Sequence, residues 1–375
     1  MEKYIIALQQ LGIKNEVILQ LITQYSSSDI ELIFDDYKDN VFMSDIAFTS
    51  QSGIFDNPEK IGDALEKAIK ILDESQQLNI KISIYGDSNY PFNFYNIKNP
   101  PVLIYYKGED IGKKFNKAIA CVGTRKPTKL SYNIMNYLVP QLVEEGYSII
   151  SGLALGSDRL AHISTLMNAG NTIAVLAHGL DQVFPKKNQR LAEDILSNGG
   201  TLVSEYPVGI KPENFRYINR NRLIVGLAKG VIVGECSVKS GTMHSVEFGK
   251  EDGIPIFCAD PHNIINEEQE GLKLLLEERI AIKVLNGRDY DVIIKNTGYE
   301  KEGKELTIDY IRRTYIKALL YNLWDNKELY NDILKKLNIE QCKESWQRPL
   351  NVSREDEREV LNALLEICVE NKISD

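Results

Sequence analysis

The feature that most constrains the fold is a regular alternation of short apolar runs and helical patterns over about residues 117–285. Each gap between two runs holds apolar residues at three- and four-residue spacing, as in an amphipathic helix. Repeated βαβ units of this kind predict an α/β fold with a parallel, doubly wound sheet whose strands are buried on both faces. The predicted strands are Ala118–Val122, Ser148–Ile150, Thr172–Ala177, Thr201–Val203, Gly230–Val233 and Ile254–Cys258.

The two ends of the chain have a different pattern. Residues 1–75 and the region after about 300, including Thr307–Trp324, have helical spacing, whereas Lys81–Tyr85 and Val102–Tyr106 resemble strands. We therefore expect a mostly parallel central sheet with small helical modules at both ends. The expected divisions are an N-terminal helical module at 1–75, a central domain at 80–290 with its core at 113–285, and a C-terminal helical domain at 300–375.

The net charge of −9 argues against a nucleic-acid partner, but the charge is distributed unevenly. Residues 1–112 carry net −8 and residues 291–375 net −3, whereas residues 113–290 carry net +2. Because local potential is what an anionic ligand meets, we expect the central domain to make the anion contacts. Its two basic clusters are Lys113, Lys114, Lys117, Arg125, Lys126 and Lys129, and Lys211, Arg216, Arg220 and Arg222.

Several classes of protein are excluded. No apolar stretch approaches the roughly 20 residues of a membrane span, and no basic segment with an apolar core opens the chain. We expect a cytoplasmic protein without a membrane partner. The five cysteines are odd in number and lack a Cys-x-x-Cys pair, which favours reduced, buried thiols. The four histidines lack metal-ligand spacing, so we expect neither a metal nor a cofactor.

Polar, glycine-containing turns follow the predicted strands. Gly123-Thr124-Arg125, the segment Ser151–Asp158 and Ser240-Gly241-Thr242 each precede a helical pattern. Helix amino termini bind phosphate through free backbone N–H groups, and open α/β sheets bind ligands at this edge. The chain has neither the Gly-x-Gly-x-x-Gly fingerprint after its first strand nor a Gly-x-x-x-x-Gly-Lys-Ser/Thr loop. We therefore predict that the carboxyl-terminal edge of the sheet binds phosphates. The alternative interpretation of each segment is an ordinary turn without a ligand.

A catalytic interpretation is weaker. His162, beside Ala161 on a helix, is better explained as a packing residue than as a catalyst. Ser240 and His244 lack an orienting acid, which disfavours a hydrolytic triad. Glu247 has two interpretations. Its side chain either faces the ligand crevice as an acid, or stabilises the positive amino end of its own helix. Three aromatic residues beside the arginines either stack on bases or fill the core, namely Tyr206, Phe215 and Tyr217.

Six ordered motifs resemble those of the DNA-processing protein A (DprA, also called Smf) family. They are Val122–Thr128, Ser151–His162, Ala174–Asp181 with Phe184, Pro185 and Asn188, Ser204–Pro207, Asn219–Leu227 and Ser240–Thr242. The resemblance covers about residues 80–285. It implies a Rossmann-like domain and a homodimer that binds and protects single-stranded DNA. It also implies loading of the RecA recombinase during natural transformation, without chemical turnover.

The resemblance and the phosphate-binding turns together give the candidate DNA site. Its residues are Gly123, Thr124, Arg125, Lys126, Ser151, Gly152, Lys211, Arg216, Asn219, Arg220, Asn221, Arg222, Ser240, Gly241 and Thr242. The chain departs from the family at Ser157, where isoleucine is usual, and its C-terminal helices do not resemble a winged helix. The alternative hypothesis is a Rossmann-like nucleotide sensor or a phosphoribohydrolase-type enzyme, with phage defence as another pathway.

Overall fold

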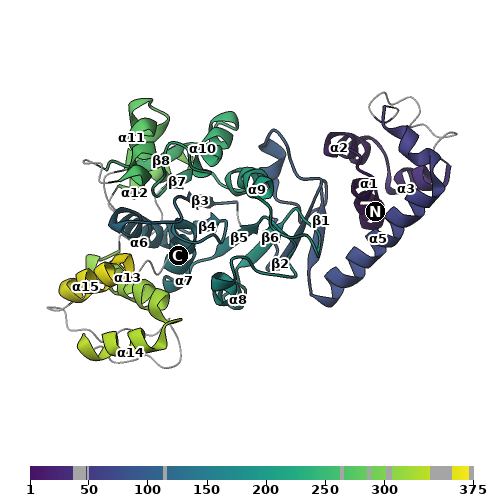
Figure 1. Ribbon diagram of the computed structural model, residues 1–375. Coiled ribbons are helices and arrows are strands. Elements are labelled where there is room, and N and C mark those ends of the chain that lie inside the picture. Colours follow the sequence, from purple (N-terminus) through teal and green to yellow (C-terminus); the bar gives the residue numbers. More distant parts are fainter. Residues whose placement is uncertain are drawn as a thin grey trace.

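A single mixed sheet runs through the centre of the protein (Figure 1). The computed structural model describes residues 1–36, 48, 50–112, 116–261, 266–284, 289–300, 306–337 and 357–370. Within them, the strand order is β1-β2-β6-β5-β4-β3-β7-β8-β9. The strands are β1 Lys81–Ile84, β2 Leu103–Gly108, β3 Ala118–Val122, β4 Ser148–Ser151, β5 Thr172–Leu176, β6 Thr201–Ser204, β7 Val231–Val233, β8 Ile256–Ala259 and β9 Ala281–Val284.

The predicted doubly wound α/β fold is confirmed. Strands β3 to β9 are mutually parallel, and β3 pairs with β4 on one side and β7 on the other. The strand order therefore reverses between β3 and β7, which is where sheets of this class bind ligands. Strands β1 and β2 extend the sheet in antiparallel fashion beyond β6. The edge strand β9 was not predicted, because its half-exposed pattern includes Lys283 and lacks a continuous apolar run.

Helices cover both faces of the sheet. One face carries α6 Lys129–Glu144, α7 Ser157–Met167 and α8 Gln189–Ser197, and the other carries α9 Asn214–Gly226, α10 Thr242–Glu251 and α11 Glu270–Glu277. The two-residue period of a strand explains the double burial. In β3, Ile119 and Cys121 pack with the α6 side, whereas Ala118, Ala120 and Val122 pack with the α9 side.

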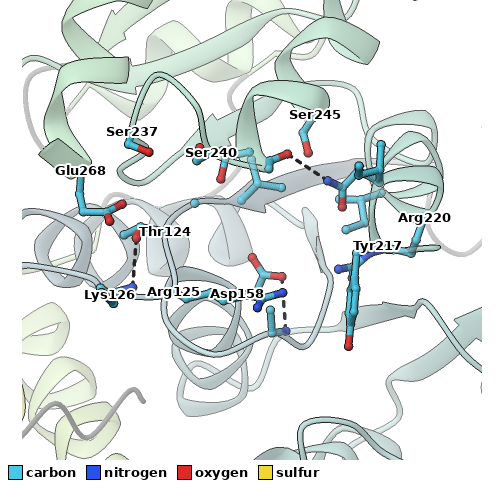
Figure 2. A pocket seen from close by; sticks show the side chains of 18 residues that line it. Thr124, Arg125, Lys126, Asp158, Tyr217, Arg220, Ser237, Ser240, Ser245 and Glu268 are labelled. Carbon is cyan, nitrogen blue, oxygen red and sulfur yellow. Dashed lines mark hydrogen bonds between the residues drawn. The ribbon is translucent and has the colours of Figure 1, made fainter. Parts of the chain in front are cut away.

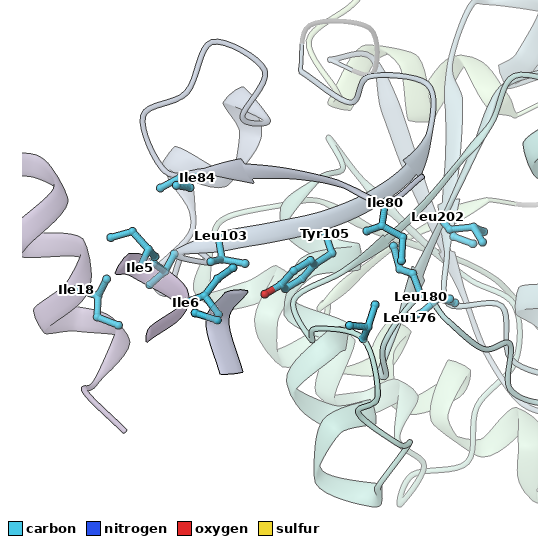
Figure 3. Close-up of a cluster of buried hydrophobic side chains, with 14 of the residues drawn as sticks. Ile5, Ile6, Ile18, Ile80, Ile84, Leu103, Tyr105, Leu176, Leu180 and Leu202 are labelled. Carbon is cyan, nitrogen blue, oxygen red and sulfur yellow. The ribbon is translucent and has the colours of Figure 1, made fainter. Parts of the chain in front are cut away.

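The N-terminal helices pack against the β1–β2 end of the sheet. These helices are α1 Glu2–Gln10, α2 Asn15–Gln24, α3 Ser27–Asp36 and α5 Pro58–Gln77. Ile5 and Ile6 of α1 share one buried cluster with Ile84, Leu103 and Tyr105 of the two strands (Figure 3). Burial of several such side chains at about 1.5–3 kcal/mol each holds the module against the sheet.

The C-terminal helices pack over α6 and α7. These helices are α12 Tyr290–Asn296, α13 Ile308–Leu323, α14 Lys327–Lys336 and α15 Glu357–Glu370. Thr307 caps the predicted helix α13 by accepting a bond from the Tyr310 N–H. Arg159 of α7 is buried and donates to Asn322 of α13 at 3.0 Å and to Asn188 at 2.6 Å. The hydrogen bonds of Arg159 therefore add to the apolar packing between the C-terminal helices and the central domain.

The remaining expectations concern single residues and spans. Four cysteines, Cys121, Cys236, Cys258 and Cys368, are free and buried, and Cys342 lies outside the described residues. In the described part of the chain, no cluster of three or more His, Cys, Asp or Glu side chains is arranged to hold a metal ion. None of its helices combines the length and the apolar character needed to span a bilayer.

Candidate nucleic-acid interface

A cavity of about 310 Å³ opens at the carboxyl ends of β3 and β7, where the strand order reverses. Its wall comes from the turn after β3, the start of α7, one face of α9 and the start of α10 (Figure 2). We call this cavity the switch-point pocket. The candidate site residues that line it are Gly123, Thr124, Arg125, Lys126, Arg220, Asn221, Ser240, Gly241 and Thr242.

The turn after β3 presents a free cation. The Thr124 N–H donates to the Glu235 carbonyl at 2.7 Å, and the Lys126 N–H donates to Thr124 Oγ1 at 3.0 Å. These bonds fix the backbone, while the Arg125 side chain is exposed. Its guanidinium carbon lies 5.5 Å from the centre of the Tyr217 ring, a cation–π distance. Arg125 is therefore positioned to meet an anion at the mouth of the pocket.

The buried carboxylate of Glu235 holds this turn in place. It accepts bonds from the Thr128 N–H at 2.8 Å, from Thr128 Oγ1 at 2.6 Å, from Ser131 Oγ at 2.7 Å and from Gln269 Nε2 at 2.9 Å. The carboxylate thereby neutralises the free N–H groups at the start of α6. Glu235 was not among the residues predicted for the site. Its position directly after β7 was the available signal.

Two buried residues of opposite charge form the floor of the pocket. Arg220 of α9 and Asp158 of α7 are 4% and 6% exposed. Arg220 donates to the Val175 carbonyl, and Asp158 accepts from the N–H groups of Gly152 at 3.1 Å and Ala154 at 3.4 Å. Burial raises the pKa of Asp158, and the nearby Arg220 opposes that shift. Arg220 is thus a structural cation of the floor, in contrast to the exposed Arg125.

The predicted phosphate turn at Ser151–Asp158 is corrected by the structure. Ser151 is buried and donates to the Cys121 carbonyl at 2.6 Å, while Gly152 donates to Asp158. The amino end of α7 is covered as well, since the Ser157 N–H donates to the Thr124 carbonyl at 3.0 Å. These groups are already bonded within the protein. Gly152 therefore lies against Arg220, and its N–H is not free to bind a ligand.

The start of α10 supplies the opposite wall. Gly241 is its N-cap and makes no side-chain cap bond. Ser240 Oγ, just before the helix, and Ser245 Oγ, near its start, are buried and have no hydrogen-bond partner in the described structure. Unsatisfied hydroxyls at a helix start can donate hydrogen bonds to an anionic oxygen. Ser245 was not predicted from the sequence, although its spacing from Gly241 places both on one face of the helix.

Helix α9 divides the second basic cluster between two sites. Its Tyr217, Arg220 and Asn221 face the switch-point pocket. Its Phe215, Arg216, Asn219 and Arg222 face a second cavity of about 670 Å³ on the side of the N-terminal module. We call this cavity the second hollow. The second basic cluster is therefore divided between two cavities, because successive residues of a helix point about 100° apart.

The cations at the second hollow are partly neutralised. Arg222 forms a two-pronged ion pair with Glu205 and donates to the Asn99 carbonyl at 2.7 Å. Arg216 donates to Glu213 at 2.9 Å and to the Lys211 carbonyl. The Lys211 residue itself is exposed beside the hollow.

Aromatic rings flank the Arg216 guanidinium. The ring centres of Tyr206 and Phe215 lie 5.4 and 5.0 Å from its central carbon. Phe215 is 52% exposed, so the core-packing interpretation is wrong for this residue. Tyr206 and Tyr217 are half-buried and line the hollow and the pocket, respectively.

The first basic cluster separates in space. Lys117 lies at the start of β3, opposite the end that carries Arg125, and its ammonium is 4.8 Å from the Tyr147 ring centre. Lys129 pairs with Glu366 of α15 at 3.1 Å. Lys113 and Lys114 lie outside the described residues. Among the described members of this cluster, Arg125 and Lys126 are the two that line the pocket.

The histidines and Glu247 have surroundings that favour the non-catalytic interpretations. His162 is fully buried, Nδ1 lies 2.7 Å from Thr172 Oγ1, and burial lowers its pKa to about 3. The interpretation of His162 as a packing residue is confirmed. His244 is exposed, and Glu247 is exposed with Lys250 3.9 Å away. His262 lies outside the described residues.

Comparisons with known proteins match the central domain and much of the remaining chain. The family model of DNA recombination-mediator protein A matches residues 81–295. The chain is 34% identical over 286 residues to the DNA processing protein DprA of Streptococcus pneumoniae, covering 75% of this chain and 94% of that protein. It is 32% identical over 217 residues to DprA of Bacillus subtilis, covering 58% of this chain and 72% of that protein.

Two solved structures are similar as well. The X-ray structure of DprA from Streptococcus pneumoniae has a TM-score of 0.63 at 28% identity, covering 80% of this chain and 99% of that one. A structure of DprA from Helicobacter pylori, solved to describe its single-stranded DNA binding mode, has a TM-score of 0.51 at 29% identity, covering 59% and 98%. The family match spans more than half of the chain, and the pneumococcal relative is matched over nearly its whole length. This chain belongs to the DNA recombination-mediator protein A family.

Proposed function

We propose that this protein binds single-stranded DNA and acts by binding, without chemical turnover. The observation that carries the proposal is the switch-point pocket, where an exposed arginine, the start of α10 and two unsatisfied hydroxyls face one another. Groups of these three kinds contact the phosphate oxygens of a nucleic-acid backbone. The Helicobacter pylori relative, described in its single-stranded DNA binding mode, supports the same ligand class.

The preference for single strands follows from two properties of the site. The phosphate ligands lie in a cavity rather than on a flat surface, which limits the approach of a rigid duplex. The exposed Phe215 ring offers a stacking face to an unpaired base. Stacking of this kind is worth about 1–3 kcal/mol per base. Bases that are already paired and stacked do not gain this contact.

The wider role proposed here is that of a recombination mediator. Family membership supports loading of a RecA recombinase on the bound strand during natural transformation, and a homodimer as the active form. A pull-down of RecA with the purified chain, in the presence and absence of single-stranded DNA, tests the first point. Light scattering of the free protein tests the second. Failure of RecA to associate in both conditions would contradict the loading role while leaving DNA binding intact.

The alternative ligand is a single nucleotide. A cavity of about 310 Å³ is at the small end of the range for small-molecule sites, so its volume alone admits both ligands. The phosphoribohydrolase version is less well supported, because Glu247 is exposed and faces Lys250. Release of a free base from a nucleoside monophosphate, abolished by Glu247→Gln, would favour that enzyme activity over the binding role.

The deciding experiment is a titration with single-stranded DNA, duplex DNA and a panel of mononucleotides at two salt concentrations. We expect single strands to bind best, with a log–log salt slope of about −0.7 for each neutralised phosphate. Arg125→Glu should remove most of this affinity. Arg358→Glu, the same change on the exposed side of α15, is the matched control. Equal affinity for duplex, or normal binding by Arg125→Glu, would contradict the proposed site.

A further inference from the structure

One wall of the second hollow comes from the N-terminal module. On one side lie Phe215, Arg216 and Asn219 of α9. On the other lie Gln9 and Gln10 at the end of α1 and Asn15 at the start of α2. The N-terminal module is fixed there by the apolar cluster it shares with β1 and β2 (Figure 3). The hollow therefore exists only when both parts of the chain are present.

The N-terminal wall is rich in side-chain amides. Each carboxamide carries two donors and an acceptor, the same kinds of groups that line the edges of nucleobases. Gln9 Nε2 donates to Asn15 Oδ1 at 3.3 Å, which holds these two amides side by side. Gln10 and Asn15 are exposed. Across the hollow, the exposed face of Phe215 offers the flat apolar surface on which a base stacks.

The charges at the hollow favour a neutral ligand group over a phosphate. Glu205 neutralises Arg222, and Glu213 neutralises Arg216. Lys98 lies 3.8 Å from Glu251, and the N-terminal wall adds the carboxylate of Glu16. The switch-point pocket differs, because Arg125 is exposed there beside unsatisfied hydroxyls. The two cavities thus suit the two halves of a nucleotide, the phosphate and the base.

The two cavities lie on either side of one helix. Tyr217, Arg220 and Asn221 of α9 line the pocket, and Phe215, Asn219 and Arg222 line the hollow. An α-helix with its side chains is about 10–12 Å across. A flexible strand that places a phosphate at Arg125 can therefore cross α9 and place a neighbouring base in the hollow.

We infer that the N-terminal module forms one wall of the DNA site, and that Gln10, with Gln9 and Asn15, binds an unpaired base of the strand held at Arg125. This inference rests on the proposed function. It revises the sequence-based expectation that the central domain makes all the contacts to the nucleic acid. The acidic charge of the module is no obstacle, because a base carries no charge for it to repel.

The test uses the full-length chain and the isosteric change Gln10→Glu. Gln10 is the last residue of α1 and Gln24 the last residue of α2, and both are exposed. Gln24→Glu is therefore a control with the same chemistry at an equivalent helix position. The probes are a single-stranded oligonucleotide of mixed sequence and an abasic phosphodiester of the same length, measured by fluorescence anisotropy. Thermal melting of both variants checks that each is folded.

We expect Gln10→Glu to weaken binding of the mixed oligonucleotide about tenfold, or about 1.4 kcal/mol. Its affinity for the abasic probe should change less, so the preference for bases shrinks. Gln24→Glu should remain within about twofold of the wild type for both probes. If Gln10→Glu behaves like Gln24→Glu while Arg125→Glu loses binding, the inference is overturned and the hollow belongs to another occupant, such as a protein. If the wild type binds neither probe, the proposed function itself fails.

Discussion

Replacing Gly152 by alanine tests the architecture of the pocket floor. A Cβ built at this position lies 1.7 Å from Arg220 Nη1 and 2.3 Å from Cζ, distances that no pair of atoms tolerates. The backbone at Gly152 does not have a positive φ, so the substitution itself causes no backbone strain. The guanidinium of Arg220 must move. Because it is 4% exposed and bonded to the Val175 carbonyl, the movement breaks existing bonds.

The magnitude follows from the interaction of two buried charges that is weakened. Arg220 and Asp158 interact through their charges, and removing one partner of a closely paired buried charge costs about 3–5 kcal/mol. Asp158 keeps its bonds from the Gly152 and Ala154 N–H groups, and Arg220 retains a path toward the pocket opening. We therefore expect the lower end of the range, about 3 kcal/mol. At roughly 2–4 °C per kcal/mol for a domain of 150–250 residues, the melting temperature should fall by about 6–12 °C.

The assay is thermal and urea unfolding of Gly152→Ala beside Gly62→Ala. Gly62 lies within α5 and has open space where its Cβ would be, so alanine there should be neutral or stabilise by up to about 1 kcal/mol. The destabilisation at position 152 should be largest at neutral pH and decline in acid. Burial already raises the pKa of Asp158. Once protonated, Asp158 is neutral and is no longer stabilised by the charge of Arg220.

A double-mutant cycle gives the refuting result. In an Arg220→Ala background there is no guanidinium for the new methyl group to displace. Gly152→Ala should then cost less than about 0.5 kcal/mol more. If instead the two changes add fully, or if Gly152→Ala is as mild as Gly62→Ala, the close approach of Arg220 to Gly152 is not what shapes the floor.

Three further predictions concern other parts of the site. Glu235→Gln should lose about 1.5–3 kcal/mol in urea unfolding, because an amide NH₂ would face N–H donors, and a loss below about 0.5 kcal/mol would contradict this role. His162 has a pKa lowered from its ordinary 6.5 to about 3, so the unfolded chain binds more protons between these values. Stability should therefore fall by up to about 1.4 kcal/mol per pH unit as the pH drops below 6.5, and His162→Gln should flatten that dependence. Arg125→Ala should reduce the salt slope of DNA binding by about 0.7, whereas the paired change Arg222→Gln with Glu205→Gln should leave it unchanged, as fluorescence titrations at several salt concentrations would reveal.

The fold was predictable where strands are buried on both faces. The runs at β3 and β5 are continuous and apolar, so their boundaries matched the prediction closely. The edge strand β9 is partly exposed and contains Lys283, which left no comparable signal. The antiparallel addition of β1 and β2 beyond β6 depends on contacts between distant segments, and local patterns carry no information about such pairing.

The site was predictable in its position but less so in its chemistry. Two of the strand-end turns chosen from the sequence, Gly123-Thr124-Arg125 and Ser240-Gly241-Thr242, line the pocket. The solvent exposure of each arginine was not predictable, because it depends on side chains from distant segments of the chain. Nothing in the sequence pattern distinguishes Arg125 from Arg220 and Arg222. In the structure the first is exposed, the second lies buried beside Asp158, and the third pairs with Glu205.

Helix α9 limits how this protein can change during evolution. One side of the helix, including Leu223 and Val225, packs on the sheet, and two other sides line the two cavities. Insertion or deletion of one residue would rotate everything beyond it by about 100° and exchange these roles. The length of α9 is therefore under stronger constraint than that of α10, which contributes only its first turns to the pocket. New specificity should arise in this protein by substitution along α9 and by change in the N-terminal module, without any change in the number of residues in that helix.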